Sequence, residues 1–230
     1  MLLPRECIVC GRQLTAREEQ LCIWCAADLP LTYTWEQPHN IMANRFNETL
    51  ERIRAPDETF QYAYAVSLLY YHRENPYKNI PQALKYGGNI TAGKWFASLL
   101  GEHIAKAPHF RDVDTVIPVP LHWRRKFTRG YNQAQVIAEE IARALGANLR
   151  TDVLSRGRRT RSQTTLSADE RLGNIQGAFR LRHAIPAGHI LLVDDAFTTG
   201  APLSECWITL RRALGPSVRI SVATLAMVEA

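Results

Sequence analysis

The residue types that could do chemistry gather near the carboxyl end of the chain. Residues 190–193 are apolar and predict a short buried strand, which ends in the adjacent carboxylates Asp194 and Asp195. A turn of small residues then leads into an amphipathic helix, and this turn consists of Thr198, Thr199, Gly200 and Ala201. Backbone N–H groups and the helix dipole at such a start favour a phosphate, while the acids could hold sugar hydroxyls or Mg²⁺. The pattern therefore favours a phosphorylated sugar.

An ordinary strand, turn and helix with two solvated aspartates would show the same pattern, and this alternative stays open. Pro202 follows the turn and suits the first turn of a helix, but it offers a phosphate neither a hydroxyl nor a backbone N–H. One or two lost charge-assisted hydrogen bonds, each worth ~1.5–3 kcal/mol, are expected to weaken phosphate binding about tenfold or more.

Two C-x-x-C pairs lie near the amino terminus, Cys7 with Cys10 and Cys22 with Cys25. Four thiolates at this spacing offer zinc a tetrahedral site, and Gly11 suits the tight turn after the first pair. So short a segment buries little core, so the metal would supply most of its folding free energy, on the order of 10 kcal/mol. Disulfides and a redox C-x-x-C are the alternatives, and the sequence favours structural zinc.

The chain has 230 residues with 28 Lys and Arg against 22 Asp and Glu, a formal net charge of +6. Two segments concentrate the basic residues: Arg124, Arg125, Lys126 and Arg129 form the first, and Arg150, Arg156, Arg158, Arg159 and Arg161 form the second. Such runs attract the phosphates of a small ligand or of nucleic acid, although a solvated basic face would look the same. The stretch from Arg158 to Thr164 reads equally as a mobile lid or as a disordered basic loop.

These residues must be positioned by an α/β fold, because predicted strands and helices alternate along the chain. Strands are expected at 63–71, 113–119, 190–193 and 218–225, with a short extended piece near 149–154. Helices are expected at 44–54, 91–104 and 203–214, and also before Gly87 and after Asn132. The loops after 113–119 and 190–193 should meet at one edge of a parallel sheet.

Single residues refine these expectations. Asn132 is expected to cap its helix, with Gln135 completing a capping box and Gly146 ending the helix. Cys206 lies on the last helix and is expected to be a small core residue. No apolar stretch is long enough for a membrane span or a secretory signal, and the sequence predicts a cytoplasmic protein.

The segment from Val193 to Gly200 resembles the phosphoribosyl pyrophosphate (PRPP) signature of type I phosphoribosyltransferases. The resemblance implies that Asp194 and Asp195 contact the ribose hydroxyls, and that the turn from Thr198 to Ala201 holds the 5′-phosphate. The match departs at Pro202, where the family usually has Thr or Ser.

The order of motifs over nearly the whole chain resembles the ComF family, which is associated with DNA uptake in natural competence and related to GntX-type proteins. Its members show an amino-terminal zinc module and a Lys-Tyr-x-Gly segment, here residues 85–88. An Arg-Gly-aromatic-Asn-Gln block follows at 129–133, and Gln-x-x-Leu and Arg-x-x-Asn blocks at 163–166 and 171–174. Some relatives carry a second set of zinc cysteines that this chain lacks.

The resemblance implies a phosphoribosyltransferase-type core at 111–230, preceded by a zinc module at 1–30 and a helical or hood segment at 31–110. It also implies that pyrophosphate binds to basic residues: Lys85, Arg124, Arg125, Arg129 and Arg158. Surface positions for Lys85 and Arg129, and a plain helix cap for Asn132, are the alternatives.

Two functions follow from the resemblance. The favoured one is a competence protein that binds PRPP with Mg²⁺ and single-stranded DNA, with Trp123, Phe127 and Tyr131 as stacking residues and competence-machinery proteins as partners. The alternative is an active phosphoribosyltransferase, a glycosyltransferase that moves ribose 5-phosphate from PRPP to an unknown base or amine. A regulator that senses PRPP is a third class.

Overall fold

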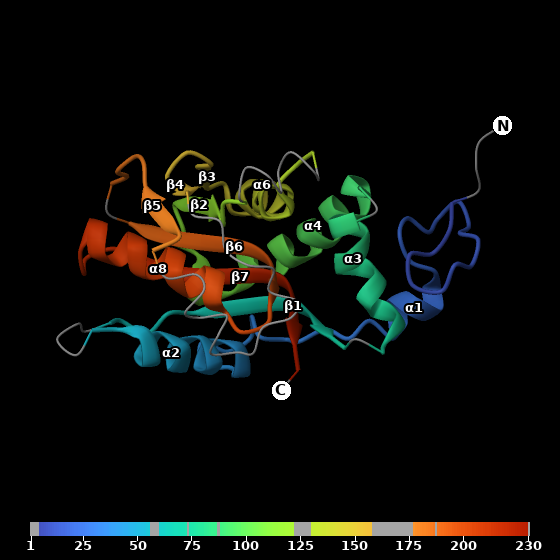
Figure 1. Ribbon diagram of the computed structural model, residues 1–230. Helices are drawn as coiled ribbons and strands as arrows, with labels where there is room; N and C mark the ends of the chain where they lie inside the picture. Colours follow the sequence, from blue (N-terminus) through green and yellow to red (C-terminus); the bar gives the residue numbers. More distant parts are fainter. Residues whose placement is uncertain are drawn as a thin grey trace.

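The computed structural model describes residues 5–55, 60–72, 74–86, 88–121, 130–157, 177–186 and 188–229. A parallel sheet of five strands forms its centre, in the order β1-β7-β6-β2-β3 (Figure 1). These strands are β1 (Ala65–Tyr71), β2 (Thr115–Pro118), β3 (Asn148–Leu149), β6 (His189–Phe197) and β7 (Arg219–Val228). The predicted α/β class with a parallel sheet is confirmed.

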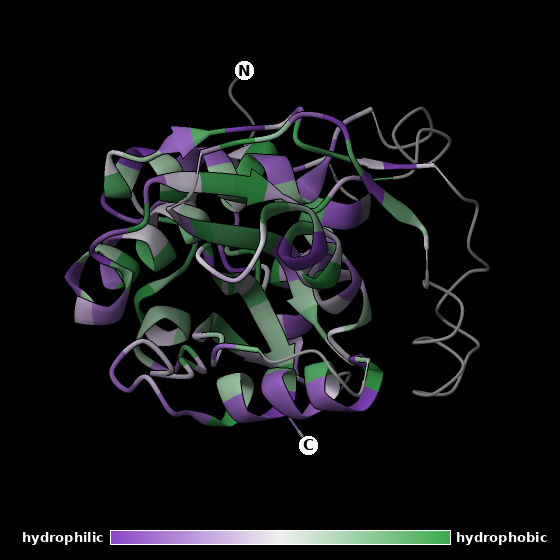
Figure 2. Cartoon of the chain, turned by 90° about the vertical axis from the view of Figure 1, so that its left-hand side faces the viewer, coloured by the Kyte–Doolittle hydropathy of each residue, from purple (hydrophilic) through white to green (hydrophobic). Residues whose placement is uncertain are grey.

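Helices cover both faces of this sheet. On one face, α2 (Ile41–Ile53) and α8 (Ala201–Leu214) share a hydrophobic cluster with Ile190 and Leu192 of β6. On the other face, α3 (Asn79–Tyr86), α4 (Ile90–Lys106) and α6 (Gln133–Leu145) pack with Leu191 and Val193. The apolar residues of β6 therefore alternate between two cores, as expected for a central strand buried on both sides. Figure 2 shows hydrophobic strands inside and hydrophilic outer faces on the helices.

The remaining elements are short. The amino-terminal segment contains α1 (Ile23–Ala27), and the 3-10 turns η1 (Pro76–Lys78) and η2 (Pro108–Phe110) precede α3 and β2. A separate antiparallel ribbon consists of β4 (Leu154–Arg156) and β5 (Phe179–Leu181). The segment expected to be one extended piece at 149–154 is therefore divided, with its start in β3 of the central sheet and its end in β4 of the ribbon.

Two local expectations need correction. The strand expected to end at Val193 continues to Phe197, because β7 pairs with Asp194, Ala196 and Phe197 in register. Asp194 and Asp195 thus lie on the strand and not beyond it. The capping box at α6 is not formed, since the Gln135 side chain donates to Glu139 at 3.1 Å.

Other local expectations are confirmed. Asn132 caps α6 by accepting from the Ala134 N–H, and Gly146 ends the helix in a left-handed conformation (φ 64°). Cys206 is fully buried. Among the described residues, no helix combines the length and apolar character that a bilayer crossing needs.

Candidate functional site

The carboxyl ends of β2 and β6 meet at one edge of the sheet, as expected from their order. The two strands pair in parallel up to Pro118 and Val193, and the Val119 N–H donates to the Val193 carbonyl at 2.8 Å. The Asn132 amide in turn donates to the Val119 carbonyl at 3.0 Å. The start of α6 is therefore tied to the same edge as the acids of β6.

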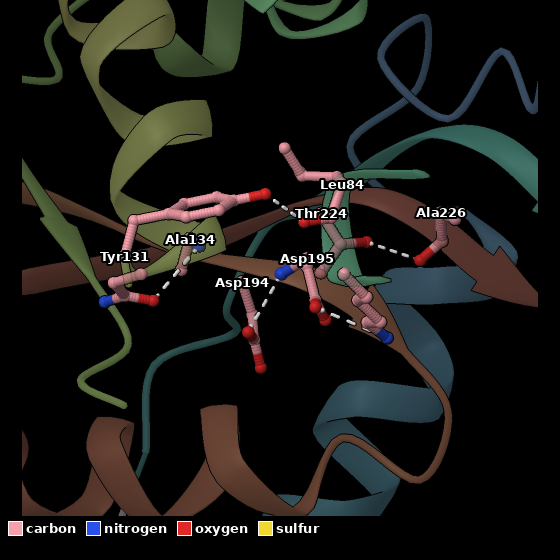
Figure 3. A network of polar contacts seen from close by, with 9 residues as sticks. Leu84, Tyr131, Ala134, Asp194, Asp195, Thr224 and Ala226 are labelled. Carbon is pink, nitrogen blue, oxygen red and sulfur yellow. Dashed lines mark hydrogen bonds and ion pairs between the residues drawn. The ribbon is translucent and has the colours of Figure 1, made fainter. Parts of the chain in front are cut away.

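Asp195 forms an ion pair with Lys85, the basic residue in the last turn of α3. Lys85 Nζ lies 3.3 Å from Asp195 Oδ2, and the two side chains are 27% and 16% exposed. The end of α3 is held in place by Tyr131, whose hydroxyl donates to the Leu84 carbonyl (Figure 3). Lys85 of α3 thus contacts a carboxylate of β6, and Tyr131, shortly before α6, holds the end of α3 beside it.

Asp194 lies in a different environment, because successive side chains of a strand point to opposite faces. Its Oδ1 accepts from the Asp195 N–H at 2.8 Å (Figure 3). Burial, followed by the charge of Asp195, raises the pKa of Asp194 to about 7, while Lys85 and Arg156 act in the opposite direction. Near neutral pH this carboxyl can therefore exist in both protonation states.

The turn after β6 has the geometry expected of a phosphate-binding turn. Gly200 adopts a left-handed conformation (φ 71°) directly before α8. A Cβ at this position would also lie 2.6 Å from Cε2 of Phe197, so glycine is needed on two grounds. Among the described residues no side chain caps α8, and Pro202 occupies its first turn. The Ala201 N–H donates to the Thr199 hydroxyl at 3.5 Å, and the other N–H groups of the first turn are the donors that an anion could use.

The structure brings together only some of the residues implied by the resemblance. Asp194, Asp195, Lys85 and the turn from Thr198 to Ala201 lie at one edge of the sheet. The basic residues Arg124, Arg125, Arg129 and Arg158 lie outside the described residues, as do the aromatic residues Trp123 and Phe127.

Arg156 is a site residue that the sequence did not single out from its basic cluster. It ends β4, with its guanidinium 5.2 Å from the centre of the Phe179 ring, and its charge lowers the pKa of Asp194. The signal available in the sequence was its place between a short β segment and the run of arginines. That signal gives no indication that β4 approaches β6.

The four amino-terminal cysteines form a second candidate site. The sulfur atoms of Cys7, Cys10, Cys22 and Cys25 all lie within 4.8 Å of one another, and Cys10 Sγ lies 3.7 Å from Cys22 Sγ. A regular tetrahedron with Zn–S distances of ~2.3 Å would separate its sulfur atoms by about 3.8 Å. All four thiols are free of disulfides, and their arrangement fits structural zinc.

The electrostatics of this cluster also suit a cation. Burial works against ionisation of Cys7, yet backbone N–H groups of Cys10, Cys22 and Val9 lower the pKa of its thiol to about 7. Burial and the neighbouring thiols raise the pKa of Cys25. Thiolates packed this closely repel one another, so a divalent cation is needed for all four to be ionised together.

The cysteine module contacts the helix that carries Lys85 to the carboxyl end of β6. The Tyr77 hydroxyl donates to the Cys25 carbonyl at 3.1 Å, and the Asn79 amide donates to the Val9 carbonyl at 3.4 Å. Tyr77 lies in η1 and Asn79 begins α3, the helix that carries Lys85. The conformation of the cysteine module therefore affects the position of Lys85.

Comparison with known proteins gives several relatives. Competence protein F of Haemophilus influenzae is 31% identical over 147 residues, which are 61% of this chain and 64% of that protein. Competence protein ComFC of Streptococcus pneumoniae is 31% identical over 121 residues, 53% of this chain and 50% of that protein. DNA utilization protein YhgH of Escherichia coli K12 is 36% identical over 92 residues, 40% of each chain. The chain thus spans less than two thirds of the relatives that it matches.

Similarity to solved structures is more distant. A protein of Thermus thermophilus, TT1426, matches with 18% identity and a TM-score of 0.35, over 60% of this chain and 83% of that one. The allosteric regulatory enzyme of purine biosynthesis matches with 19% identity and a TM-score of 0.36, over 56% and 25%. No protein-family model matches the chain. Its homologues are nevertheless proteins named for competence and DNA utilization, so the resemblance to the ComF family is confirmed.

Proposed function

We propose that this protein acts in DNA uptake during natural competence, binding PRPP with Mg²⁺ at the carboxyl end of β6 and single-stranded DNA through its basic segments. One observation carries the PRPP part. An acid pair, a glycine turn and an uncapped helix start lie at one sheet edge, with Lys85 3.3 Å from Asp195. The names of the relatives support the role in DNA uptake.

Each part of a PRPP molecule has a counterpart at this edge. Ribose hydroxyls donate to carboxylates, which Asp194 and Asp195 supply, and the 5′-phosphate accepts from the N–H groups that begin α8. Lys85 supplies positive charge for pyrophosphate, and we propose that the arginines near residue 125, which lie outside the described residues, add to it. Mg²⁺ prefers oxygen ligands and commonly binds with substrate phosphates, so the acids and the pyrophosphate together suit it.

Single-stranded DNA is the second part of the proposal. The formal net charge of +6 is concentrated in two arginine-rich segments, and the first also contains Trp123 and Phe127. Arginine pairs with phosphates and aromatic rings stack on bases, which is the usual combination at single-strand sites. In the sequence, the first segment follows β2 and the second contains β4. DNA and PRPP would therefore bind to neighbouring parts of the molecule.

Phosphoribosyl transfer is a second candidate function, and the raised pKa of Asp194 favours it. In that reaction an acceptor nitrogen bonds to the ribose C1 as the bond from C1 to pyrophosphate breaks. The acceptor nitrogen also gives up a proton, and a carboxyl with a pKa of about 7 is suited to take it.

Thermal unfolding tests the PRPP site. PRPP with Mg²⁺ is expected to raise the melting temperature of the wild-type protein, and the combined Asp194→Asn and Asp195→Asn variant is expected to show no shift. Mg²⁺ with ribose alone serves as the ligand control. A wild-type protein that gives no shift, or a variant that shifts equally, contradicts the proposal.

Fluorescence anisotropy with a labelled oligonucleotide tests DNA binding. Changing Arg124, Arg125 and Arg129 to Ala should weaken binding and reduce the slope of log affinity against log salt by about 2. The matched control changes three exposed arginines elsewhere: Arg12, Arg17 and Arg52. Equal losses in both variants contradict a specific DNA site. Pyrophosphate release from PRPP only in the presence of an acceptor would establish the transferase function.

A further inference from the structure

Arg45 of α2 reaches the turn that follows β6, although 153 residues separate the two in sequence. Its Nη2 donates to the Thr198 carbonyl at 3.2 Å, and its Nη1 donates to the Val228 carbonyl at 2.6 Å. The same guanidinium lies 5.3 Å from the centre of the Phe197 ring. One half-buried side chain therefore joins the end of β6, the turn and the end of β7.

The contact with Thr198 determines the direction of a neighbouring donor. A trans peptide unit is planar, so the carbonyl of one residue and the N–H of the next point in opposite directions. Because Arg45 holds the Thr198 carbonyl, the Thr199 N–H points away from Arg45. This N–H belongs to the turn whose backbone donors would hold a 5′-phosphate.

Phe197 connects Arg45 with Gly200. The ring stacks with the guanidinium and lies so close to Gly200 that a Cβ there would be 2.6 Å from Cε2. Phe46 of α2 packs against the same ring, with centroids 6.4 Å apart. Residues of α2 therefore pack against the turn. The conformation of the turn depends on the packing of Phe197 between Arg45 and Gly200.

The positive charge of Arg45 offsets what Pro202 fails to offer a phosphate. Proline provides the turn with neither a hydroxyl nor a backbone N–H, so fewer direct donors serve a phosphate. Arg45 adds a positive charge beside the turn, and positive charge favours a phosphate dianion. Because Pro202 provides no N–H, the site relies more on the remaining backbone donors of the turn, which Arg45 helps to position.

We propose that Arg45 is a positioning residue for the phosphate-binding turn, and that it makes the site selective for ligands with a terminal sugar phosphate. This inference rests on the proposed PRPP site. It assigns the 5′-phosphate end of that site to α2, in the segment between the metal module and β1. Pyrophosphate, which would bind near Lys85, does not depend on Arg45.

Calorimetric titration with PRPP, ribose 5-phosphate and pyrophosphate, each with Mg²⁺, tests the assignment. Arg45→Gln should weaken ribose 5-phosphate and PRPP by about tenfold to a hundredfold, and leave pyrophosphate affinity within about twofold. Arg45→Lys, which keeps the charge but has no planar fork, should give an intermediate loss. Arg52→Gln on the same helix is the matched control, since Arg52 is exposed.

The outcomes separate the two proposals. If wild-type protein binds none of the three ligands, the PRPP site and the role of Arg45 are both overturned. If wild-type protein binds PRPP and Arg45→Gln binds it equally well, only the role of Arg45 is overturned. Equal losses for pyrophosphate and ribose 5-phosphate also overturn it, because general damage to the fold would do the same. Melting temperatures of all variants without ligand identify such damage.

Discussion

Acidic residues lie near both ends of β6, but their hydrogen-bond partners differ. At the amino end, Asp114 accepts from the His189 N–H at 2.9 Å and from the Thr115 hydroxyl at 2.6 Å. Asp112 lies 2.9 Å from His189 Nδ1 and forms an ion pair with Arg219. At the carboxyl end, Asp194 and Asp195 have Lys85 and the Asp195 N–H as their close partners.

The difference separates structural polar groups from groups that can serve a ligand. Asp112, His189 and Ser221 form a chain of hydrogen bonds like that of a hydrolase triad, with His189 Nε2 2.8 Å from the Ser221 hydroxyl. Ser221 is fully buried and His189 is 2% exposed, so no substrate reaches them. The carboxylates of β6 are instead partly exposed beside an uncapped helix start. Accessibility, more than residue type, marks the carboxyl end of β6 as the candidate site.

Removal of metal from the cysteine module should have the largest effect, and only at the carboxyl end. Zinc held by the four cysteines would supply about 10 kcal/mol of the folding free energy of the module. Its loss should release Tyr77 and Asn79 from their carbonyl partners and displace the helix that carries Lys85. Chelation should therefore weaken PRPP binding at least about tenfold, measured by calorimetry with metal content followed in parallel.

Cys10→Ser is the variant that should reproduce the effect of chelation, and Arg17→Gln is its matched control because Arg17 is exposed and lies in the same module. Full PRPP affinity in protein stripped of metal would contradict the link between module and site.

Gly188→Ala should damage the amino end alone. A Cβ at Gly188 would lie 1.9 Å from Oδ2 of Asp114, which the His189 N–H and Thr115 hold in place. The expected cost is about 3 kcal/mol, a fall in melting temperature of roughly 6–12 °C. Gly157→Ala is the control, since nothing lies within 4 Å of its added Cβ. A large loss of PRPP affinity in Gly188→Ala at a temperature where it is folded would break the separation of the two ends.

Asp195→Asn and Asp114→Asn form a pair of opposite variants. Asp195→Asn should lower PRPP affinity about tenfold to a hundredfold and change the melting temperature little, because it removes an acceptor from a partly exposed site. Asp114→Asn should lower the melting temperature and leave PRPP affinity unchanged. Calorimetry and thermal unfolding of both variants measure this crossover, and parallel losses in the two would refute it.

The pH dependence of stability should have opposite signs at the two ends. Burial lowers the pKa of His189 to about 4, so the unfolded chain binds the extra proton and stability falls as pH drops from about 6.5 towards 4. This amounts to about 2 kcal/mol at pH 5. Burial raises the pKa of Asp194 to about 7, so its contribution falls as pH rises from about 4 through 7.

Urea unfolding between pH 5 and 8 measures both contributions. His189→Gln should reduce the loss of unfolding free energy at acid pH. Asp194→Asn should make the protein relatively more stable above pH 7. An acid loss that stays unchanged in His189→Gln would show that His189 does not titrate as its burial requires.

The sequence predicted the fold well wherever apolar patterning decides it. Apolar runs such as 190–193 indicated buried strands, and their alternation with helices indicated a parallel sheet. The end of β6 was misplaced because acids and small residues usually mark a strand end, whereas pairing with β7 extends it to Phe197. Pairing with a distant strand leaves no local signal. The division at residues 30 and 110 stays a prediction, and β1, from the middle segment, pairs with β7.

The candidate site was predictable only where its residues are consecutive. Asp194, Asp195 and the following turn form one motif, and the cysteine pairs form another. Lys85 entered through the family resemblance, and the structure places it beside Asp195. Arg45 and Arg156 carry no comparable signal, since each reaches the site from an unrelated element. Long-range packing, not motif chemistry, positions them.

The most direct test is a calorimetric titration of the wild-type protein with PRPP and Mg²⁺, repeated with ribose 5-phosphate as competitor. Saturable binding of one PRPP per chain, displaced by ribose 5-phosphate and lost in Asp194→Asn with Asp195→Asn, is the predicted result. Absence of saturable binding to the metal-loaded protein, or binding that the double variant retains, would contradict a sugar-phosphate site at the carboxyl end of β6.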